Sequence, residues 1–278
     1  MTRSQNLIVR PGANEPMAED QEAAAEKLSR LLEMKKNGEQ IVALTAYDYP
    51  SGRLLDEAGV DLILVGDSLG MVVLGYEDTT SVTIDEMTHH LRACRRGVQR
   101  APLVADLPFN SYETPVQAVE NARRLIGSGA DAVKLEGGTA VREQVEAIVA
   151  AGVGIVGHIG MLPQHVREEG GYKKKGKTDE QVELLLQDAR DLEIAGAVAI
   201  VLEGMVPEVA AMITENANIP TIGIGAGPDC DGQILVTPDL LGAFPWFRPA
   251  FAKARADVAG ETQRAVAEFI EAVRNKQG

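Results

Sequence analysis

The chain has 278 residues, a formal net charge of -14 and a sequence pI of about 4.8. This charge predicts that it binds neither nucleic acid nor an anionic membrane surface, because both carry the same sign as the protein. Its apolar runs fall well short of the roughly 18 residues of a membrane span, and residues 1–16 lack a signal-peptide core, so we expect a cytoplasmic protein. The length and the 45% hydrophobic content suit one α/β barrel.

The N-terminal region divides into a polar arm and a helix. Residues 1–19 mix Arg, Asn, Pro and Gly with little apolar periodicity, and we expect them to form a flexible arm. From Asp20 the pattern turns helical, and Gly38 is the predicted C-terminal stop of that helix. The helix leads into the rest of residues 20–278, which we predict to form a single catalytic domain.

A repeating unit follows, in which a short apolar run ends in a polar residue, passes through a loop and enters a helical pattern. The predicted strands are Ile41–Asp48, Leu62–Asp67, Leu103–Asp106, Ala132–Glu136, Gly154–His158, Ala199–Glu203, Thr221–Gly225 and Ile234–Val236. Strands that alternate with helices in this way favour a closed (β/α)₈ TIM barrel of parallel strands. A doubly wound open sheet is the alternative, which periodicity alone does not exclude.

Three helix starts between these strands show capping chemistry, in which a hydroxyl accepts from a free N–H group and a side chain three residues later reaches back. The predicted capping boxes are Thr83 with Glu86, Thr114 with Gln117 and Thr178 with Gln181. They predict where three of the helices begin.

Polar residues end six of the predicted strands, namely Asp48, Asp67, Asp106, Glu136, His158 and Glu203. In α/β barrels the active site lies at the C-terminal ends of the strands. The acids of the second, third and fourth strands would converge there, and three neighbouring carboxylates repel one another unless a hard cation such as Mg²⁺ binds them. We therefore predict Asp67, Asp106 and Glu136 as metal ligands.

Three further side chains are candidates at the same rim. Lys134 lies two residues before Glu136, so the period of a strand points both in one direction. We predict that it binds an anionic substrate, while charge neutralisation and a Schiff base are alternatives. Glu203, across the rim, is the predicted general base, with a structural ion pair as its alternative. His158 fits either a supporting role or an ordinary hydrogen bond.

Two motifs point to other classes of enzyme. Gly66–Gly70 matches the Gly-x-Ser-x-Gly nucleophile elbow around Ser68, but the base of such hydrolases usually comes late in the chain and no histidine follows His165. Gly171–Thr178 matches a P-loop before a helix, but no apolar strand runs into its first glycine. We therefore expect neither serine hydrolysis nor nucleotide hydrolysis.

Several uncommon strings occur together in register. They are Thr-Ala-Tyr-Asp-Tyr at 45–49, Val-Gly-Asp-Ser-Leu-Gly-Met at 65–71, Ala-Asp-Leu-Pro-Phe at 105–109, Val-Lys-Leu-Glu-Gly-Gly at 133–138 and Gly-Ile-Gly-Ala-Gly at 223–227. From about Leu28 to Gly260 the chain resembles the ketopantoate hydroxymethyltransferase family of the phosphoenolpyruvate mutase and isocitrate lyase superfamily. The resemblance also implies a (β/α)₈ barrel.

The resemblance implies hydroxymethyl transfer from 5,10-methylenetetrahydrofolate to 3-methyl-2-oxobutanoate in pantothenate synthesis, with Mg²⁺ as cofactor and a homo-oligomer, usually a decamer, as the assembly. The implied roles are Mg²⁺ binding for Asp67, Asp106 and Glu136, 2-oxo acid binding for Asp67, Ser68, Asp106 and Lys134, and proton removal for Glu203. A carbon-carbon lyase of the same superfamily and a non-catalytic barrel that binds a 2-oxo acid are the alternatives. The basic loop 173–177 is a hypothetical contact for an anionic folate tail.

Overall fold

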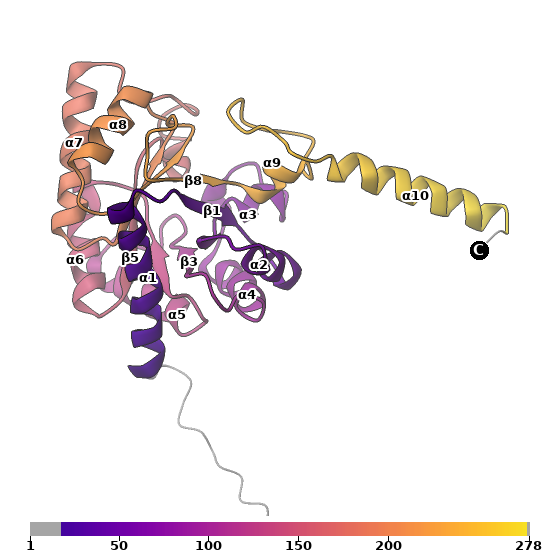
Figure 1. The fold of residues 1–278 in the computed structure, drawn as a ribbon, viewed down its shortest axis with the longest axis horizontal. Helices are drawn as coiled ribbons and strands as arrows, with labels where there is room; N and C mark the ends of the chain where they lie inside the picture. The colour runs from indigo at the N-terminus through magenta and orange to yellow at the C-terminus, as the bar shows by residue number, and fades with distance from the viewer. Residues whose placement is uncertain (1–17, 277–278) are drawn as a thin grey trace, which may run out of the picture.

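The computed structural model describes residues 18–276 and closes eight parallel strands into a barrel in the order β1 to β8 (Figure 1). The strands are β1 (Ile41–Thr45), β2 (Leu62–Val65), β3 (Leu103–Asp106), β4 (Ala132–Lys134), β5 (Gly154–Gly160), β6 (Ala199–Glu203), β7 (Thr221–Ile224) and β8 (Gly232–Leu235). Because β1 also pairs with β8, the sheet has no edge. The predicted TIM barrel is confirmed, and the open-sheet alternative is wrong.

Helices surround the barrel or cover its ends. They are α1 (Ala18–Asn37), α2 (Tyr49–Glu57), α3 (Leu69–Val72), α4 (Ile84–Arg95), α5 (Pro115–Ile126), α6 (Arg142–Ala150), α7 (Asp179–Ile194), α8 (Pro207–Asn216), α9 (Thr237–Leu241) and α10 (Val258–Arg274). Helix α1 begins close to the predicted Asp20 and ends before Gly38, whose φ of 70° suits glycine. The predicted arm falls almost wholly outside the described residues, so its boundary stays a prediction.

Helix α1 closes the N-terminal end of the barrel. Its buried Leu28 and Leu31 belong to the same apolar cluster as the barrel-interior residues Ile41, Val104 and Ile222. Burying one leucine side chain contributes about 1.5–3 kcal/mol, so these two residues stabilise the packing of α1 against the barrel. A second, larger cluster fills the layer between the strands and the outer helices. The floor of the barrel is therefore sealed by hydrocarbon, and the cavity lies at the opposite end, where the strands finish.

The predicted helix caps are present, with one difference. Thr83 and Glu86 form a complete capping box at α4. Thr114 and Thr178 accept from the expected N–H groups of α5 and α7. The glutamine three residues later, however, accepts from the loop before the cap in both helices. The amide side chain thus anchors the preceding loop as well as the helix.

Several predicted strand ends differ from the structure: β2 ends at Val65, β4 ends at Lys134 and β5 continues to Gly160. The largest difference is in β1. Strand β1 stops at Thr45, and Asp48 lies at the start of α2, where its carboxylate accepts the N–H of Ser51 at 2.8 Å. Asp48 is exposed and does not line the barrel cavity. A carboxylate that caps a helix accepts from a free N–H group. Asp48 therefore follows the apolar run because it caps α2, and not because it belongs to the site.

The last helix, α10, extends away from the barrel into solvent (Figure 1). It carries Val266, Phe269, Ile270 and Val273 on its surface, and Phe269 is 69% exposed. A helix with a wide exposed apolar face usually buries that face against another element. Within residues 18–276, no helix is long and apolar enough to cross a membrane.

Candidate active site at the C-terminal ends of the strands

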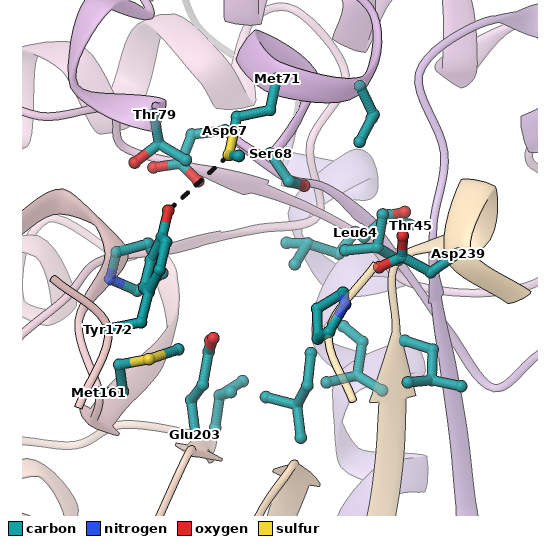
Figure 2. Close-up of a pocket in the computed structure, with 18 of the residues that line it drawn as sticks. Thr45, Leu64, Asp67, Ser68, Met71, Thr79, Met161, Tyr172, Glu203 and Asp239 are labelled. Atoms are coloured by element: carbon teal, nitrogen blue, oxygen red, sulfur yellow. Dashed lines mark hydrogen bonds between the residues drawn. The ribbon is translucent and has the colours of Figure 1, made fainter. Parts of the chain in front are cut away.

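A cavity of about 490 Å³ opens at the C-terminal ends of the strands (Figure 2). It is lined by every side chain predicted for the site, namely Asp67, Ser68, Asp106, Lys134, Glu136, His158 and Glu203. They come from the ends of β2 to β6, or from the residues just after them. In Figure 2, the carboxylate of Glu203 points up into the cavity from β6, below Asp67 and Ser68.

The three predicted metal ligands are buried together. Asp67, Asp106 and Glu136 are 5%, 2% and 1% exposed, and the backbone N–H of Asp67 donates to Asp106 at 3.0 Å. Burial, followed by repulsion from Asp106 and Glu136, raises the pKa of Asp67 well above its usual range. Three neighbouring carboxylates repel one another, so the cluster favours a cation beside it.

Lys134 neutralises part of this charge. It is the register partner of Asp106 on the neighbouring strand, and its Nζ lies 2.7 Å from Asp106 Oδ1. Burial lowers the pKa of Lys134, but the carboxylates of Asp106, Glu136 and Asp67 raise it further, so the net change is upward. The side chain is therefore an ammonium ion at neutral pH and a fixed positive charge at the wall of the cavity.

His158 lies between two carboxylates. Its Nδ1 is 3.5 Å from Glu136 Oε1, and its Nε2 is 3.2 Å from Glu203 Oε2. Burial and Lys134 lower the pKa of His158, yet contacts with the two glutamates raise it to about 9. The imidazole is thus positively charged at neutral pH. It lies beside Glu203, whose side chain remains 14% exposed towards the cavity.

Gln164 is a site residue that the sequence did not indicate. It follows β5 and is 1% exposed, and its amide donates to Asp67 Oδ2 at 2.7 Å and to the carbonyl of Leu107 at 3.0 Å. Its backbone N–H donates to Glu136 Oε2 at 3.0 Å, and its amide oxygen accepts from the hydroxyl of Tyr112. One neutral residue therefore orients two of the three acids. A single glutamine in a loop belongs to no sequence pattern that would predict its role.

Neither rival motif has the geometry that its chemistry requires. The hydroxyl of Ser68 lies 2.9 Å from the phenol of Tyr47, whose pKa is raised by burial, so a weak acid takes the place of a catalytic base. In the P-loop-like segment, the N–H groups of Gly176 and Lys177 both donate to Gln181, so they do not point at a phosphate.

The donor set fits a hard divalent cation, although the side chains are not arranged around one. Among residues 18–276, there is no group of three or more His, Cys, Asp and Glu side chains placed closely enough to hold a metal ion. Lys134 binds Asp106 and Gln164 binds Asp67 instead, while His158 lies 3.5 Å from Glu136. Carboxylate oxygens are the ligands that Mg²⁺ prefers, and the buried Glu136 Oε1 has no hydrogen-bond partner within the described residues. A metal at this triad stays a prediction.

The other half of the cavity is apolar, and the sequence did not predict it. It is formed by the ends of β7 and β8, by α9 and by the segment that follows α9. The aromatic rings there are those of Phe244, Phe247 and Phe251, and the charged side chains are Asp239 and Arg248. The cavity thus has a charged half and an aromatic half.

Comparison with known proteins agrees with this geometry. Residues 26–277 match the family model described as ketopantoate hydroxymethyltransferase. A protein of Acetivibrio thermocellus named 3-methyl-2-oxobutanoate hydroxymethyltransferase is 53% identical over 246 residues, which cover 88% of this chain and 87% of that protein.

Solved structures show the same fold at low sequence identity. One is phosphonopyruvate hydrolase in complex with oxalate and Mg²⁺, with a TM-score of 0.61 and 15% identity over 91% of this chain and 88% of the other. Another is 2,3-dimethylmalate lyase, described as a member of the PEP mutase/isocitrate lyase superfamily, with a TM-score of 0.57 and 18% identity over 91% and 89%. At such identities the likeness concerns the fold alone.

Proposed function

The chain belongs to the ketopantoate hydroxymethyltransferase family and is a one-carbon transferase, and we propose that it uses 5,10-methylenetetrahydrofolate to hydroxymethylate 3-methyl-2-oxobutanoate for pantothenate synthesis. In this reaction C3 of the acid loses its proton and bonds to the donor's methylene carbon, whose two C–N bonds break. Water supplies the hydroxyl group, and the C3 proton and one water proton end on the donor's nitrogens. The products are 2-dehydropantoate and tetrahydrofolate.

The observation that carries this proposal is one cavity in which a carboxylate cluster and a separate glutamate face the same space. The ammonium of Lys134 and the hydroxyl of Ser68 would bind the anionic 2-oxo acid. Asp67, Asp106 and Glu136 would hold Mg²⁺, which when bound supplies positive charge that stabilises a developing enolate. The description of a fold neighbour as a complex with oxalate and Mg²⁺ supports this choice of metal.

Glu203 would remove the C3 proton. It reaches the cavity from β6, two strands beyond the last predicted metal ligand, so its carboxylate is separate from the triad. His158 Nε2 lies 3.2 Å from that carboxylate, which stays partly exposed to a substrate. A positioned general base of this kind contributes a rate factor of about 10² to 10⁴.

We further propose that the protein works as a homo-oligomer. The support is the exposed apolar face of α10, which the barrel of its own chain leaves uncovered (Figure 1). A second copy is the natural partner for such a face, because most oligomers of soluble proteins are symmetric. The number of subunits and the cytoplasmic location remain predictions from the sequence.

The direct test is isotope transfer. The full chain is incubated with Mg²⁺, 3-methyl-2-oxobutanoate and 5,10-methylenetetrahydrofolate labelled with ¹³C at the methylene, and the products are analysed by mass spectrometry. We expect ¹³C in 2-dehydropantoate, none after chelation of the metal, and a loss of about 10² to 10⁴ in rate for Glu203→Gln. Glu208→Gln, on the exposed face of α8, is the matched control. Unlabelled product or no product from the wild type would refute the proposal.

A further inference from the structure

The aromatic half of the cavity contains a buried carboxylate that the proposed chemistry does not use. Asp239 lies on α9 and is 6% exposed. Within residues 18–276, its carboxylate forms neither a hydrogen bond nor an ion pair with another side chain. A buried carboxylate without donors is costly, so a site of this kind is built for a ligand that brings the donors.

The helix that carries this carboxylate is anchored to the barrel. The start of α9 is fastened to the end of β1, because Thr237 donates its N–H to Thr45 Oγ1 at 3.0 Å and its hydroxyl to the Thr45 carbonyl at 2.6 Å. Figure 2 shows Asp239 beside Thr45 and across the cavity from Tyr172 and Met161. The backbone that carries Asp239 is therefore anchored at the wall of the cavity.

Flat apolar side chains line the same half of the cavity. Phe247 and Phe251 line the cavity while 50% and 42% of their surfaces stay exposed. The backbone of Gly225, with a φ of 61°, lies so close to the Phe251 ring that an added Cβ would be 2.8 Å from it, so only glycine lets the ring lie over the end of β7. Half-exposed aromatic rings at the mouth of a cavity offer surfaces on which a planar ring can stack.

The carboxylate of Asp239 favours a ring that carries hydrogen-bond donors. Burial raises the pKa of Asp239, and the positive charge of Arg248 lowers it by less. Two neighbouring N–H groups on a flat heterocycle, such as the 2-amino group and N3–H of an aminopyrimidinone, match the two oxygens of a carboxylate and replace the water that burial removes.

We propose that Asp239, with Phe247 and Phe251, binds the aminopyrimidinone ring of the one-carbon donor. This inference rests on the proposed function and assigns the donor to a defined half of the cavity. In a closed barrel of eight strands, β8 lies four strands from β4, so Asp239 lies across the barrel from Glu136. A donor bound there places its methylene carbon between its own ring and a 2-oxo acid held at the charged half.

The experiment measures two reactions of the full chain with Mg²⁺. One is donor-dependent hydroxymethylation, and the other is exchange of the C3 proton of 3-methyl-2-oxobutanoate with D₂O, which needs no donor. Asp239→Asn loses one acceptor oxygen, so we expect its KM for 5,10-methylenetetrahydrofolate to rise about 10- to 150-fold. The exchange rate and the KM for the 2-oxo acid should change less than about twofold. Asp229→Asn, an exposed aspartate before β8, is the control and should change neither.

A second variant keeps the carboxylate. Phe251→Leu removes only the stacking surface, and we expect a rise of about 2- to 12-fold in the donor KM with normal exchange. A donor KM that stays unchanged in Asp239→Asn, while the wild type transfers normally, would overturn the subsite and leave the proposed function intact. Loss of exchange in Asp239→Asn would also overturn it, because the residue would then serve the 2-oxo acid. Failure of transfer in the wild type refutes the proposed reaction itself.

Discussion

Gln164 offers a sharp test of how the acid cluster is held. Replacement Gln164→Met keeps the length of the side chain and removes the amide that donates to Asp67 and Leu107 and accepts from Tyr112. The backbone N–H of residue 164 still donates to Glu136, so the loop itself keeps its anchor. The change therefore isolates the contribution of the amide.

The magnitude follows from the bonds that are lost. A buried hydrogen bond to a charged carboxylate contributes about 1.5–3 kcal/mol, and each of the two neutral bonds contributes about 1 kcal/mol. The free energy of unfolding should therefore fall by about 3–5 kcal/mol. Because Asp67 also loses the donor that orients it, we expect the affinity for Mg²⁺ to fall about 10- to 100-fold, the usual effect of removing a group that orients a metal ligand.

The assay is calorimetric titration of the folded protein with Mg²⁺, together with urea unfolding. Gln144→Met on α6 is the control, because its amide makes a single surface bond to the carbonyl of Glu113. We expect the control to keep wild-type Mg²⁺ affinity and to lose less than about 1 kcal/mol of stability. An unchanged Mg²⁺ affinity in folded Gln164→Met would refute the view that the amide sets the geometry of the cluster.

Three more predictions concern regions outside the cluster. Burial raises the pKa of Asp56, but N–H groups of the 99–101 loop lower it more, so its stabilisation is present above about pH 4 and is lost as the pH falls through the lowered pKa. Asp56→Asn should cost about 2–4 kcal/mol in chemical unfolding at pH 7, with a smaller difference from wild type near pH 3; an equal difference at both pH values contradicts this. The double variant Lys173→Ala, Lys174→Ala should raise the KM for a polyglutamylated folate donor about 2- to 5-fold and leave the KM for the monoglutamate unchanged. Steady-state kinetics measures both values, and equal effects on the two donors argue against a contact with the tail. Phe269→Glu on α10 should lower the molar mass measured by light scattering, and a wild-type mass would show that this face is not an interface.

The fold could be predicted because its signals are local. Apolar runs, helix caps and the glycine after α1 each lie within a few residues, and their repetition indicates a barrel. The acids of the site share this property, since each one directly ends or follows an apolar run. Asp48 shows the limit of that pattern, because a carboxylate after a strand can also cap the next helix. Ser51, three residues later, is the local sign of that cap.

The aromatic half of the cavity and the amide of Gln164 depend on contacts between distant parts of the chain. Gln164 reaches Asp67 across 97 positions, and the segment that carries Phe251 comes to Gly225 only because the chain folds back over the rim. Neither residue type has a spacing that marks it. Long-range packing of neutral and aromatic side chains therefore cannot be predicted from one sequence, whereas charged residues at the ends of strands can be.

The proposed reaction depends on removal of the C3 proton of a branched 2-oxo acid by Glu203. The most direct measurement is proton NMR of 3-methyl-2-oxobutanoate in D₂O with the full chain and Mg²⁺, where exchange at C3 removes the splitting of the methyl signal. We predict exchange with the wild type and with Glu208→Gln, and a rate lower by about 10² to 10⁴ with Glu203→Gln. Exchange at the wild-type rate in Glu203→Gln, or no exchange with the folded wild type, would contradict this account.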